Sequence, residues 1–262
     1  MELSFKEIKN LQKYKKARDE QGLFVTEGRK LFLEAPKEDL VEVLATRAYA
    51  KEYGEDFKKL PPDVRLLDGL DEGRFMSLAD TKSPQGILTV LRKPSFSMEM
   101  VFQEADPLFL LLENLQDPGN AGTIVRTGEA AGVTAVFLTA GSADMTSPKT
   151  VRSTMGSVFR VPHFYVEDTD RLLESFRLRG VRTYAAHLLG KRSYAEEDYR
   201  GGAAFFIGNE GRGLTDALAL KADVRVRIPM KGRVESLNAA MAAGILLYEA
   251  GRQRAGGFSA GR

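Results

Sequence analysis

The fold prediction starts from residues 117–126, DPGNAGTIVR, which follow the apolar run LFLLL at residues 108–112. The proline and the glycines mark a turn at which a helix opens. Two similar junctions follow: FFIGNEGRG at residues 205–213, and a third over residues 228–238 that begins with IPM and ends with SLN. Polar turns between strands and helices are where open α/β sheets build their binding sites. Three such junctions in the C-terminal half therefore predict a site there.

Apolar runs alternate with helix-like segments from residue 107 onward. The runs are nearly continuous in Val, Ile, Phe and Leu, which is typical of strands that are buried on both faces of a sheet. The alternation predicts an α/β domain with a mostly parallel sheet and helices on both faces. The predicted strands are residues 108–112, 133–139, 158–165, 181–187, 203–208 and 224–229, and the predicted helices are about 120–131, 147–156, 168–179, 214–220 and 235–251.

The N-terminal part has a different pattern, which predicts a small separate α/β domain over residues 1–95. A linker is expected at residues 96–106, so that the larger domain occupies residues 107–262. The small domain is expected to begin with a long basic helix. Its predicted helices are residues 3–21, 29–35 and 71–80, and its predicted strands are 22–28, 41–46 and 86–91.

Composition excludes several classes of protein. Of the 262 residues, 43% are hydrophobic, but no apolar run approaches the roughly 20 residues that a membrane span needs. The first residues lack the apolar core of a signal peptide, so we expect a cytoplasmic protein without a membrane partner. The absence of cysteine excludes disulfides, thiolate metal sites and cysteine nucleophiles. Two histidines leave little for a zinc centre, and no metal is predicted.

Common nucleotide-binding motifs do not match the three junctions. The turn after residues 108–112 lacks the G-x-G-x-x-G pattern of dinucleotide folds, and the chain has no phosphate-binding P-loop. The run GNEGRG at residues 208–213 is superficially similar to a phosphate loop, but Glu210 would place a carboxylate against the phosphate. A ligand without phosphate groups fits these turns better, which disfavours an enzyme of phosphorylated small molecules.

The junctions carry a family resemblance. The chain resembles the SpoU (TrmH-type) RNA 2′-O-ribose methyltransferases of the SPOUT superfamily. Their first motif has an asparagine six residues before an arginine, here Asn120 and Arg126, and their second is Gly-x-Glu-Gly, here residues 208–211. The third pairs Ile-Pro-Met with Ser-Leu-Asn, within residues 228–238. The resemblance is strong over about residues 105–250, whereas residues 1–95 more loosely resemble the family's small substrate-binding domain.

The resemblance implies a fold and a cofactor. Members of this family tie the C-terminal segment through a loop into a trefoil knot, and they form homodimers. The knot binds S-adenosylmethionine, and the positions that match its contacts are Gly208, Ile228 and Leu237, with Met230 nearby. A glycine lets the backbone approach an adenosine group closely. The branched apolar side chains can form a wall for adenine.

The implied reaction transfers a methyl group to a ribose 2′-hydroxyl, and Arg126 is the first candidate catalytic residue. Proposals for the family make this arginine a base. Removing a guanidinium proton at neutral pH would cost about 7 kcal/mol or more. We therefore expect Arg126 to stay charged, hold a substrate phosphate and stabilise the developing alkoxide. The proton would pass to water, to a substrate phosphate or to a carboxylate such as Glu210.

The other catalytic candidates are Asn120, Glu210, Ser236 and Asn238. The two asparagine amides can each donate and accept hydrogen bonds, which suits the orientation of a hydroxyl and an arginine together. Structural roles are open as well. Asn120 or Ser236 would serve as a helix cap, and Glu210 would pin loops across the knot or a dimer interface.

RNA contact requires a local cluster of cations, because the net charge of the chain is only +2. The candidates are Lys13, Lys15, Lys16 and Arg18 in the first helix, and Arg152. A solvated helix face is the alternative for such a charge run. The two-domain organisation resembles that of members that act on ribosomal RNA. The competing functions are a tRNA 2′-O-methyltransferase and a non-catalytic RNA-binding or ribosome-assembly protein on the same fold.

Overall fold

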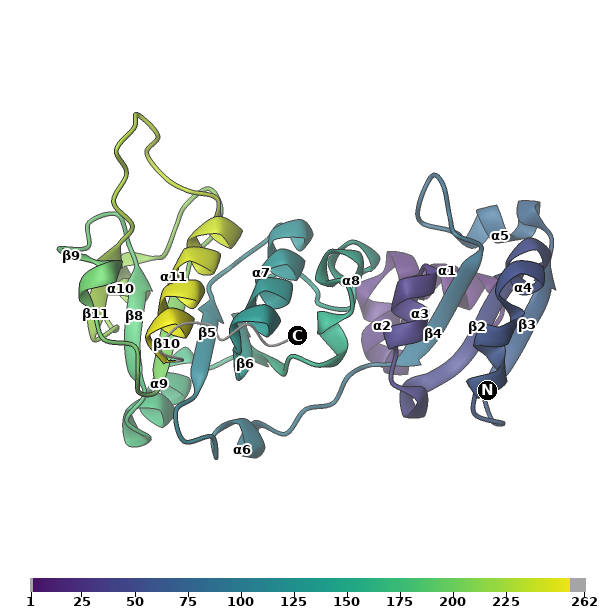
Figure 1. Cartoon of the computed structure of the whole chain (residues 1–262), viewed down its shortest axis with the longest axis horizontal. Helices are drawn as coiled ribbons and strands as arrows, with labels where there is room; N and C mark the ends of the chain where they lie inside the picture. Colours follow the sequence, from purple (N-terminus) through teal and green to yellow (C-terminus); the bar gives the residue numbers. More distant parts are fainter. Residues whose placement is uncertain (1, 255–262) are drawn as a thin grey trace. The chain divides into compact units, whose positions relative to one another are not determined.

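A computed structural model describes residues 2–254, and its contacts divide the chain into two compact units (Figure 1). Unit 1 runs to Ser95 and also includes Asp144–Phe159. Unit 2 consists of Phe96–Ala143 and the chain from Arg160 onward. Unit 1 is therefore discontinuous in sequence, which the predicted boundaries at residues 95 and 107 did not anticipate.

Unit 1 is built on a four-stranded sheet with the order β1-β4-β2-β3, counted over the described residues. The strands are β1 (Leu23–Glu27), β2 (Leu40–Thr46), β3 (Arg65–Leu70) and β4 (Ile87–Arg92). β4 pairs antiparallel with β1 and β2, whereas β2 and β3 are parallel. The helices are α1 (Phe5–Lys13), α2 (Lys15–Gln21), α3 (Arg29–Glu34), α4 (Arg47–Tyr53) and α5 (Glu72–Leu78), with 3-10 turns at Lys37–Asp39 and Gly54–Lys59.

The predicted N-terminal helix is divided into two helices at Tyr14. Ser4 caps α1 through a capping box with Glu7, which fixes where the helix begins. Tyr14 has an extended backbone, with φ −117° and ψ 122°, so it ends α1 and precedes α2. Ile8 and Leu11 of α1 are fully buried in the core that the helix forms with the sheet. The prediction missed β3 and α4.

The returning segment Asp144–Phe159 completes unit 1. It contains helix α8 (Pro148–Thr154), whose Val151 is fully buried, and the Phe159 ring lies 6.3 Å from that of Phe24 in β1. Arg18 is only 3% exposed and donates from Nε and Nη2 to one Asp144 carboxylate oxygen, at 3.0 and 2.6 Å. A buried ion pair thus joins α2 to the segment that precedes α8.

Unit 2 contains a seven-stranded sheet within the described residues, in the order β7-β6-β5-β10-β8-β11-β9. Every neighbouring pair is parallel, which confirms the predicted parallel α/β domain. The strands are β5 (Leu108–Leu112), β6 (Ala135–Thr139), β7 (His163–Val166), β8 (Arg182–Ala186), β9 (Arg192–Ser193), β10 (Ala203–Ile207) and β11 (Val224–Arg227). The helices are α6 (Met98–Val101), α7 (Pro118–Ala131), α9 (Thr169–Leu178), α10 (Asp216–Ala219) and α11 (Ala239–Arg254), with a 3-10 turn at Tyr194–Glu196.

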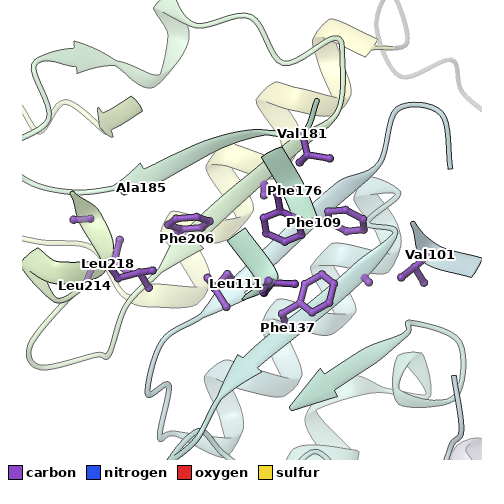
Figure 2. Packing of buried hydrophobic residues seen from close by; sticks show 14 residues of the cluster. Val101, Phe109, Leu111, Phe137, Phe176, Val181, Ala185, Phe206, Leu214 and Leu218 are labelled. Atoms are coloured by element: carbon purple, nitrogen blue, oxygen red, sulfur yellow. The ribbon is translucent and has the colours of Figure 1, made fainter. Parts of the chain in front are cut away.

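One face of this sheet is packed with aromatic side chains (Figure 2). Phe109 of β5, Phe137 of β6 and Phe176 of α9 meet there, and the rings of Phe109 and Phe176 stack at 5.3 Å. Phe206 of β10 belongs to the same cluster. Because alternate strand residues point to opposite faces, the remaining apolar positions of these strands supply the second face of the core.

Helices α7 and α11 lie side by side, and α11 also contacts β10 (Figure 1). Ala239, Ala240 and Ala243 are buried in α11, and a Cβ on Gly244 would lie 3.6 Å from Thr127 of α7. The small residues at the start of α11 thus permit close packing within the chain.

Two predicted elements begin several residues too early. The expected strand 158–165 begins only at His163, because Ser157–Phe159 form a 3-10 turn that belongs to unit 1. The last helix begins at Ala239 and not at residue 235, because Asn238 caps it. Residues 231–238 before it are exposed.

Candidate functional site

A cavity of about 300 Å³ lies in unit 2, where the chain leaves β8, β10 and β11. All three strands end at the same edge of the sheet because they are parallel. The cavity has apolar walls and a few polar groups, as ligand pockets of roughly 300–1,000 Å³ usually do. Its lining residues are 186–188, 207–214, 226, 228, 230, 235–237, 239 and 242.

The turn after β10 requires glycine at residue 208. A Cβ on Gly208 would lie 2.1 Å from both the carbonyl carbon of Gly213 and the nitrogen of Leu214. The turn is closed by hydrogen bonds between Asn209 and Gly213 in both directions, at 3.0 and 2.9 Å. The Asn209 side chain supports it further by accepting from Gly211 N and Arg212 N. The turn is therefore fixed in shape beside the cavity.

A chain of hydrogen bonds connects the three sequence junctions. The Asn120 amide nitrogen donates to Glu210 Oε1 at 3.1 Å, and the Asn238 amide nitrogen donates to Asn120 Oδ1 at 3.0 Å. Asn238 Oδ1 in turn accepts from the N–H groups of Ala240 and Met241, at 2.9 and 3.3 Å. Residues separated by about a hundred positions in the sequence thus form one polar network.

Glu210 is held as an acceptor at the start of α7. Its carboxylate also accepts from Gln116 N at 3.2 Å and from Asp117 N at 3.0 Å. Burial raises the pKa of Glu210, but hydrogen bonds from Asn120 and from backbone N–H groups outweigh it and leave the pKa below its usual value. A carboxylate of this kind is a poor proton acceptor at neutral pH. Its geometry suits a structural role, in which Glu210 connects the turn after β10 to the start of α7.

The hydrogen bonds of this network can form in only one orientation of the two asparagine amides. Both carboxylate oxygens of Glu210 accept, so Asn120 must present its N–H₂ to Glu210 and its oxygen to Asn238. Each asparagine amide retains a second N–H that this chain of bonds does not use, because an amide nitrogen carries two. The site can therefore offer hydrogen-bond donors to an oxygen that gains negative charge.

The structure brings most of the predicted site residues together. Gly208, Ile228, Met230 and Leu237, predicted for the cofactor, all line the cavity. Of the predicted catalytic residues, Glu210 and Ser236 line it as well, and Asn120 and Asn238 join it through Glu210. The capping alternatives are excluded, because Asp117 caps α7 and Asn238 caps α11.

Arg126 does not join this network. It is exposed on α7, does not line the cavity, and has no hydrogen-bond or ion-pair partner among residues 2–254. Six residues along a helix rotate a side chain by 600°, which places Arg126 about 120° around α7 from Asn120. The motif spacing therefore does not bring the two side chains to one point.

The predicted RNA contacts differ in their surroundings. Lys13, Lys15 and Lys16 are exposed, and the latter two lie 2.5 Å from Asp19 and 3.7 Å from Glu20 respectively. Arg18 is buried against Asp144, a placement that does not support a direct RNA contact. Arg152 is engaged by Asp80, with Nη1 2.6 Å from a carboxylate oxygen.

Sequence reasoning missed several lining residues. His187 and Leu188 follow β8, which carries no motif, so no signal marked them. Asn209 and Arg212 also line the cavity. They lie inside the run GNEGRG, whose glycines indicated a role for the backbone and not for these two side chains. Glu235 stands beside the Ser-Leu-Asn run and also lines the cavity.

No helix in residues 2–254 is both long and apolar enough to span a bilayer. No group of three or more His, Asp or Glu side chains there is arranged to hold a metal ion.

Comparison with known proteins identifies the family of this fold and site. Residues 107–248 match the SpoU rRNA Methylase family. The chain belongs to this family. Residues 4–89 match the MRM3-like substrate binding domain, which confirms the resemblance of the N-terminal part. The SpoU methylase match covers all three junctions that meet at the cavity.

Named relatives include methyltransferases of 23S rRNA. The chain is 34% identical over 239 residues to "23S rRNA (guanosine(2553)-2′-O)-methyltransferase RlmP" of Bacillus subtilis, covering 89% of this chain and 90% of the relative. It is 32% identical over 184 residues to "23S rRNA (uridine(2479)-2′-O)-methyltransferase" of Streptomyces viridochromogenes, covering 68% of this chain and 64% of the relative.

Solved SpoU structures have the same fold. The SpoU methyltransferase AviRb from Streptomyces viridochromogenes, in complex with the cofactor AdoMet, matches with a TM-score of 0.87 and 27% identity, over 98% of this chain and all of that one. An AdoMet-bound rRNA methyltransferase from Sinorhizobium meliloti matches with a TM-score of 0.82 and 30% identity, over 96% and 94% of the two chains.

Proposed function

We propose that this protein is an S-adenosylmethionine-dependent methyltransferase that methylates a ribose 2′-hydroxyl in ribosomal RNA. The observation that carries the proposal is the hydrogen-bond chain from Glu210 through Asn120 to Asn238, built beside the cavity. It unites the three family motifs in one site. The relatives named as 23S rRNA 2′-O-methyltransferases support the substrate class.

The cavity suits S-adenosylmethionine. Gly208 keeps the β10 turn close to the cavity, and Ile228, Met230 and Leu237 provide apolar contact for an adenosine group. When bound there, the cofactor supplies a methyl group that is activated by a positively charged sulfur. We propose that the segment from residue 228 to 238 forms the trefoil knot of this family around it.

The residues of this chain position the hydroxyl and exclude water. The free N–H groups of Asn120 and Asn238 would donate to the reacting oxygen as it gains negative charge, which lowers the barrier most when the donors are already oriented. Glu210 holds Asn120 in that orientation, and its lowered pKa keeps it charged at neutral pH. Ser236 lines the cavity and would contact the same groups. The hydroxyl proton then passes to water or to a substrate phosphate.

Arg126 would hold a phosphate of the RNA next to the modified nucleotide. A guanidinium binds phosphate through two parallel hydrogen bonds, and the exposed, unpartnered side chain on α7 is free to do so within the described chain.

Methyl transfer to RNA tests the function. Purified protein, labelled S-adenosylmethionine and RNA from a strain that lacks this protein should yield one 2′-O-methylated nucleotide in 23S-type rRNA. Mapping on naked rRNA and on ribosomal particles distinguishes the two forms of substrate. A product in tRNA alone would establish the tRNA alternative. Transfer to no RNA, with tight RNA binding retained, would establish a non-catalytic binding protein.

The small domain would contact RNA through the exposed face of α1. Lys6, Lys9 and Lys13 are exposed and follow the helical spacing i, i+3, i+7, opposite the buried Ile8 and Leu11. Lys13 Nζ lies 5.4 Å from the ring centre of Tyr14, which is also exposed. Lys15 and Lys16 extend the cluster.

Replacing Lys6, Lys9 and Lys13 together with glutamine should weaken binding to 23S rRNA and reduce its salt dependence. Each lost phosphate contact lowers the slope of log K against log salt by about 0.7–0.9, so the triple variant should lose about 2–3 in slope. Filter binding at a series of salt concentrations measures the affinity and this slope. The matched control changes Lys37, Lys51 and Lys59, which are exposed elsewhere on unit 1. Equal losses in both triples would contradict this interface.

We also propose a homodimer that forms through α7 and α11, in the cytoplasm, where ribosomal RNA is found. Met241 is 61% exposed on α11, and Tyr248 is exposed one heptad later on the same face. An exposed apolar stripe of this kind is typical of an interface.

Replacing Met241 with glutamate should convert a dimer into a monomer, because a charge would be buried at the contact. Sedimentation equilibrium measures the mass, and Leu178→Glu is the control, because Leu178 on α9 is 72% exposed. A wild-type protein that sediments as a monomer would exclude this interface.

A further inference from the structure

Among the described residues that line the cavity, one side chain, that of Arg212, is a permanent cation. Four lining side chains can carry charge: His187, Glu210, Arg212 and Glu235. Glu210 is committed to the hydrogen bonds at the start of α7. Nδ1 of His187 accepts from Leu189 N at 3.2 Å, and its Nε2 lies 3.7 Å from Asp216. Arg212 and Glu235 therefore remain as the charged groups available to a ligand.

Arg212 is held in place by its backbone while its side chain stays available. Its N–H donates to Asn209 Oδ1 at 3.1 Å, within the turn that the Asn209–Gly213 bridge closes. The side chain is exposed and has no hydrogen-bond or ion-pair partner within residues 2–254. Glu235 is likewise exposed and unpaired in that part of the chain. A fixed backbone reduces the entropy that an ion pair with a ligand must offset.

We infer that Arg212 and Glu235 form a subsite for the amino-acid end of the cofactor, a part of the ligand that the apolar wall cannot recognise. Arg212 pairs with the carboxylate, and Glu235 pairs with the ammonium group. Opposite charges on two separate segments match the zwitterion, and a guanidinium can bind a carboxylate through two hydrogen bonds. This inference rests on the proposed cofactor, and it assigns the charged end of the pocket to two residues that stand beside the motif residues of the second and third junctions.

Calorimetry with three nucleosides tests the subsite without any methyl transfer. S-adenosylhomocysteine carries both charges, its decarboxylated analogue carries only the ammonium, and methylthioadenosine carries neither. Arg212→Gln should weaken binding of S-adenosylhomocysteine by about 10- to 100-fold. Its affinity for the other two nucleosides should stay within about twofold of wild type, because neither has the carboxylate.

Glu235→Gln should show the complementary pattern. It should weaken S-adenosylhomocysteine and the decarboxylated analogue by about tenfold each and leave methylthioadenosine unchanged. Arg233→Gln, in the same exposed loop but outside the lining, is the matched control and should bind all three as wild type does.

The outcomes separate this subsite from the function on which it rests. If Arg212→Gln weakened all three nucleosides equally, the arginine would shape the turn, and the inference would be overturned. Unchanged binding of all three with weakened RNA binding would assign Arg212 to the substrate, which also overturns it. Wild-type protein that bound S-adenosylhomocysteine no better than methylthioadenosine would exclude the subsite but keep the cofactor. Binding of none of them would exclude both.

Discussion

Replacing Asn120 with aspartate should lower methyl transfer to rRNA by about 100-fold or more, the typical cost of losing one oriented donor at a charged transition state. The new carboxylate would lack the N–H that now donates to Glu210 at 3.1 Å, and it would place two negative charges side by side. Initial rates at saturating S-adenosylmethionine measure the effect. Because the cavity lining is unchanged, calorimetry should show S-adenosylhomocysteine binding close to that of wild type.

A second change provides the control for charge. In the double variant Asn120→Asp with Glu210→Gln, the amide at residue 210 can donate to the carboxylate at residue 120, so donor and acceptor exchange places. Thermal stability should return toward wild type, whereas methyl transfer should stay low because Asn120's free N–H is still missing. Full activity in the single variant would contradict the role assigned to the network.

Replacing Arg18 with alanine should destabilise the protein by about 3–5 kcal/mol, the cost of leaving one partner of a buried ion pair alone. The Asp144 side chain is only 12% exposed, so water cannot replace the guanidinium fully. Two backbone carbonyls, of Leu11 and Gln12, would lose the same partner. Urea denaturation at pH 7 measures the loss, and Lys16→Ala, an exposed change on the same helix, should cost far less.

The pH dependence of this loss has a definite sign. Burial raises the pKa of Asp144, but hydrogen bonds from Arg18 and Thr146 outweigh it and hold the pKa below its usual value. The carboxylate therefore stabilises wild type above the unfolded pKa, and this contribution is lost as pH falls through the lower folded pKa. Without Arg18, burial would favour the neutral acid. The difference between variant and wild type should thus be largest near pH 7 and shrink below about pH 4.

Asp144→Asn separates charge from packing. Placed in the Arg18→Ala background, it should recover part of the lost stability, because no buried carboxylate remains. No recovery, or a loss that is independent of pH, would show that Arg18 acts through its carbonyl contacts alone.

Local patterns were sufficient to predict the parallel sheet. The run at residues 108–112 forms β5 with the predicted bounds. A short, continuously apolar run that turn residues bound on both sides is typical of a buried strand and is too short for a helix. The family resemblance, and not a local pattern, pointed to Gly208, Ile228, Met230 and Leu237 as cofactor contacts. These four residues line one cavity at the edge where the parallel strands end.

Features that depend on distant partners were not predictable. Arg18 belongs to a basic run, and only the buried Asp144, 126 positions later, makes it structural. Serine and asparagine are equally suitable residue types for a helix cap, and in the structure Asn238, not Ser236, caps α11. Arg126 shares a motif with Asn120, but helical geometry turns the two side chains apart.

The return of Asp144–Phe159 to unit 1 has a consequence for biosynthesis. When Ser95 has been added, the first unit still lacks α8 and the carboxylate that neutralises Arg18. Roughly 60 further residues must be made first, which takes about 3–12 s at about 5–20 residues per second. During that interval β5, α7 and β6 have already been synthesised. Unit 1 therefore cannot finish folding before the synthesis of unit 2 has begun. A nascent chain released early would expose the incomplete surface of unit 1 to chaperones and proteases.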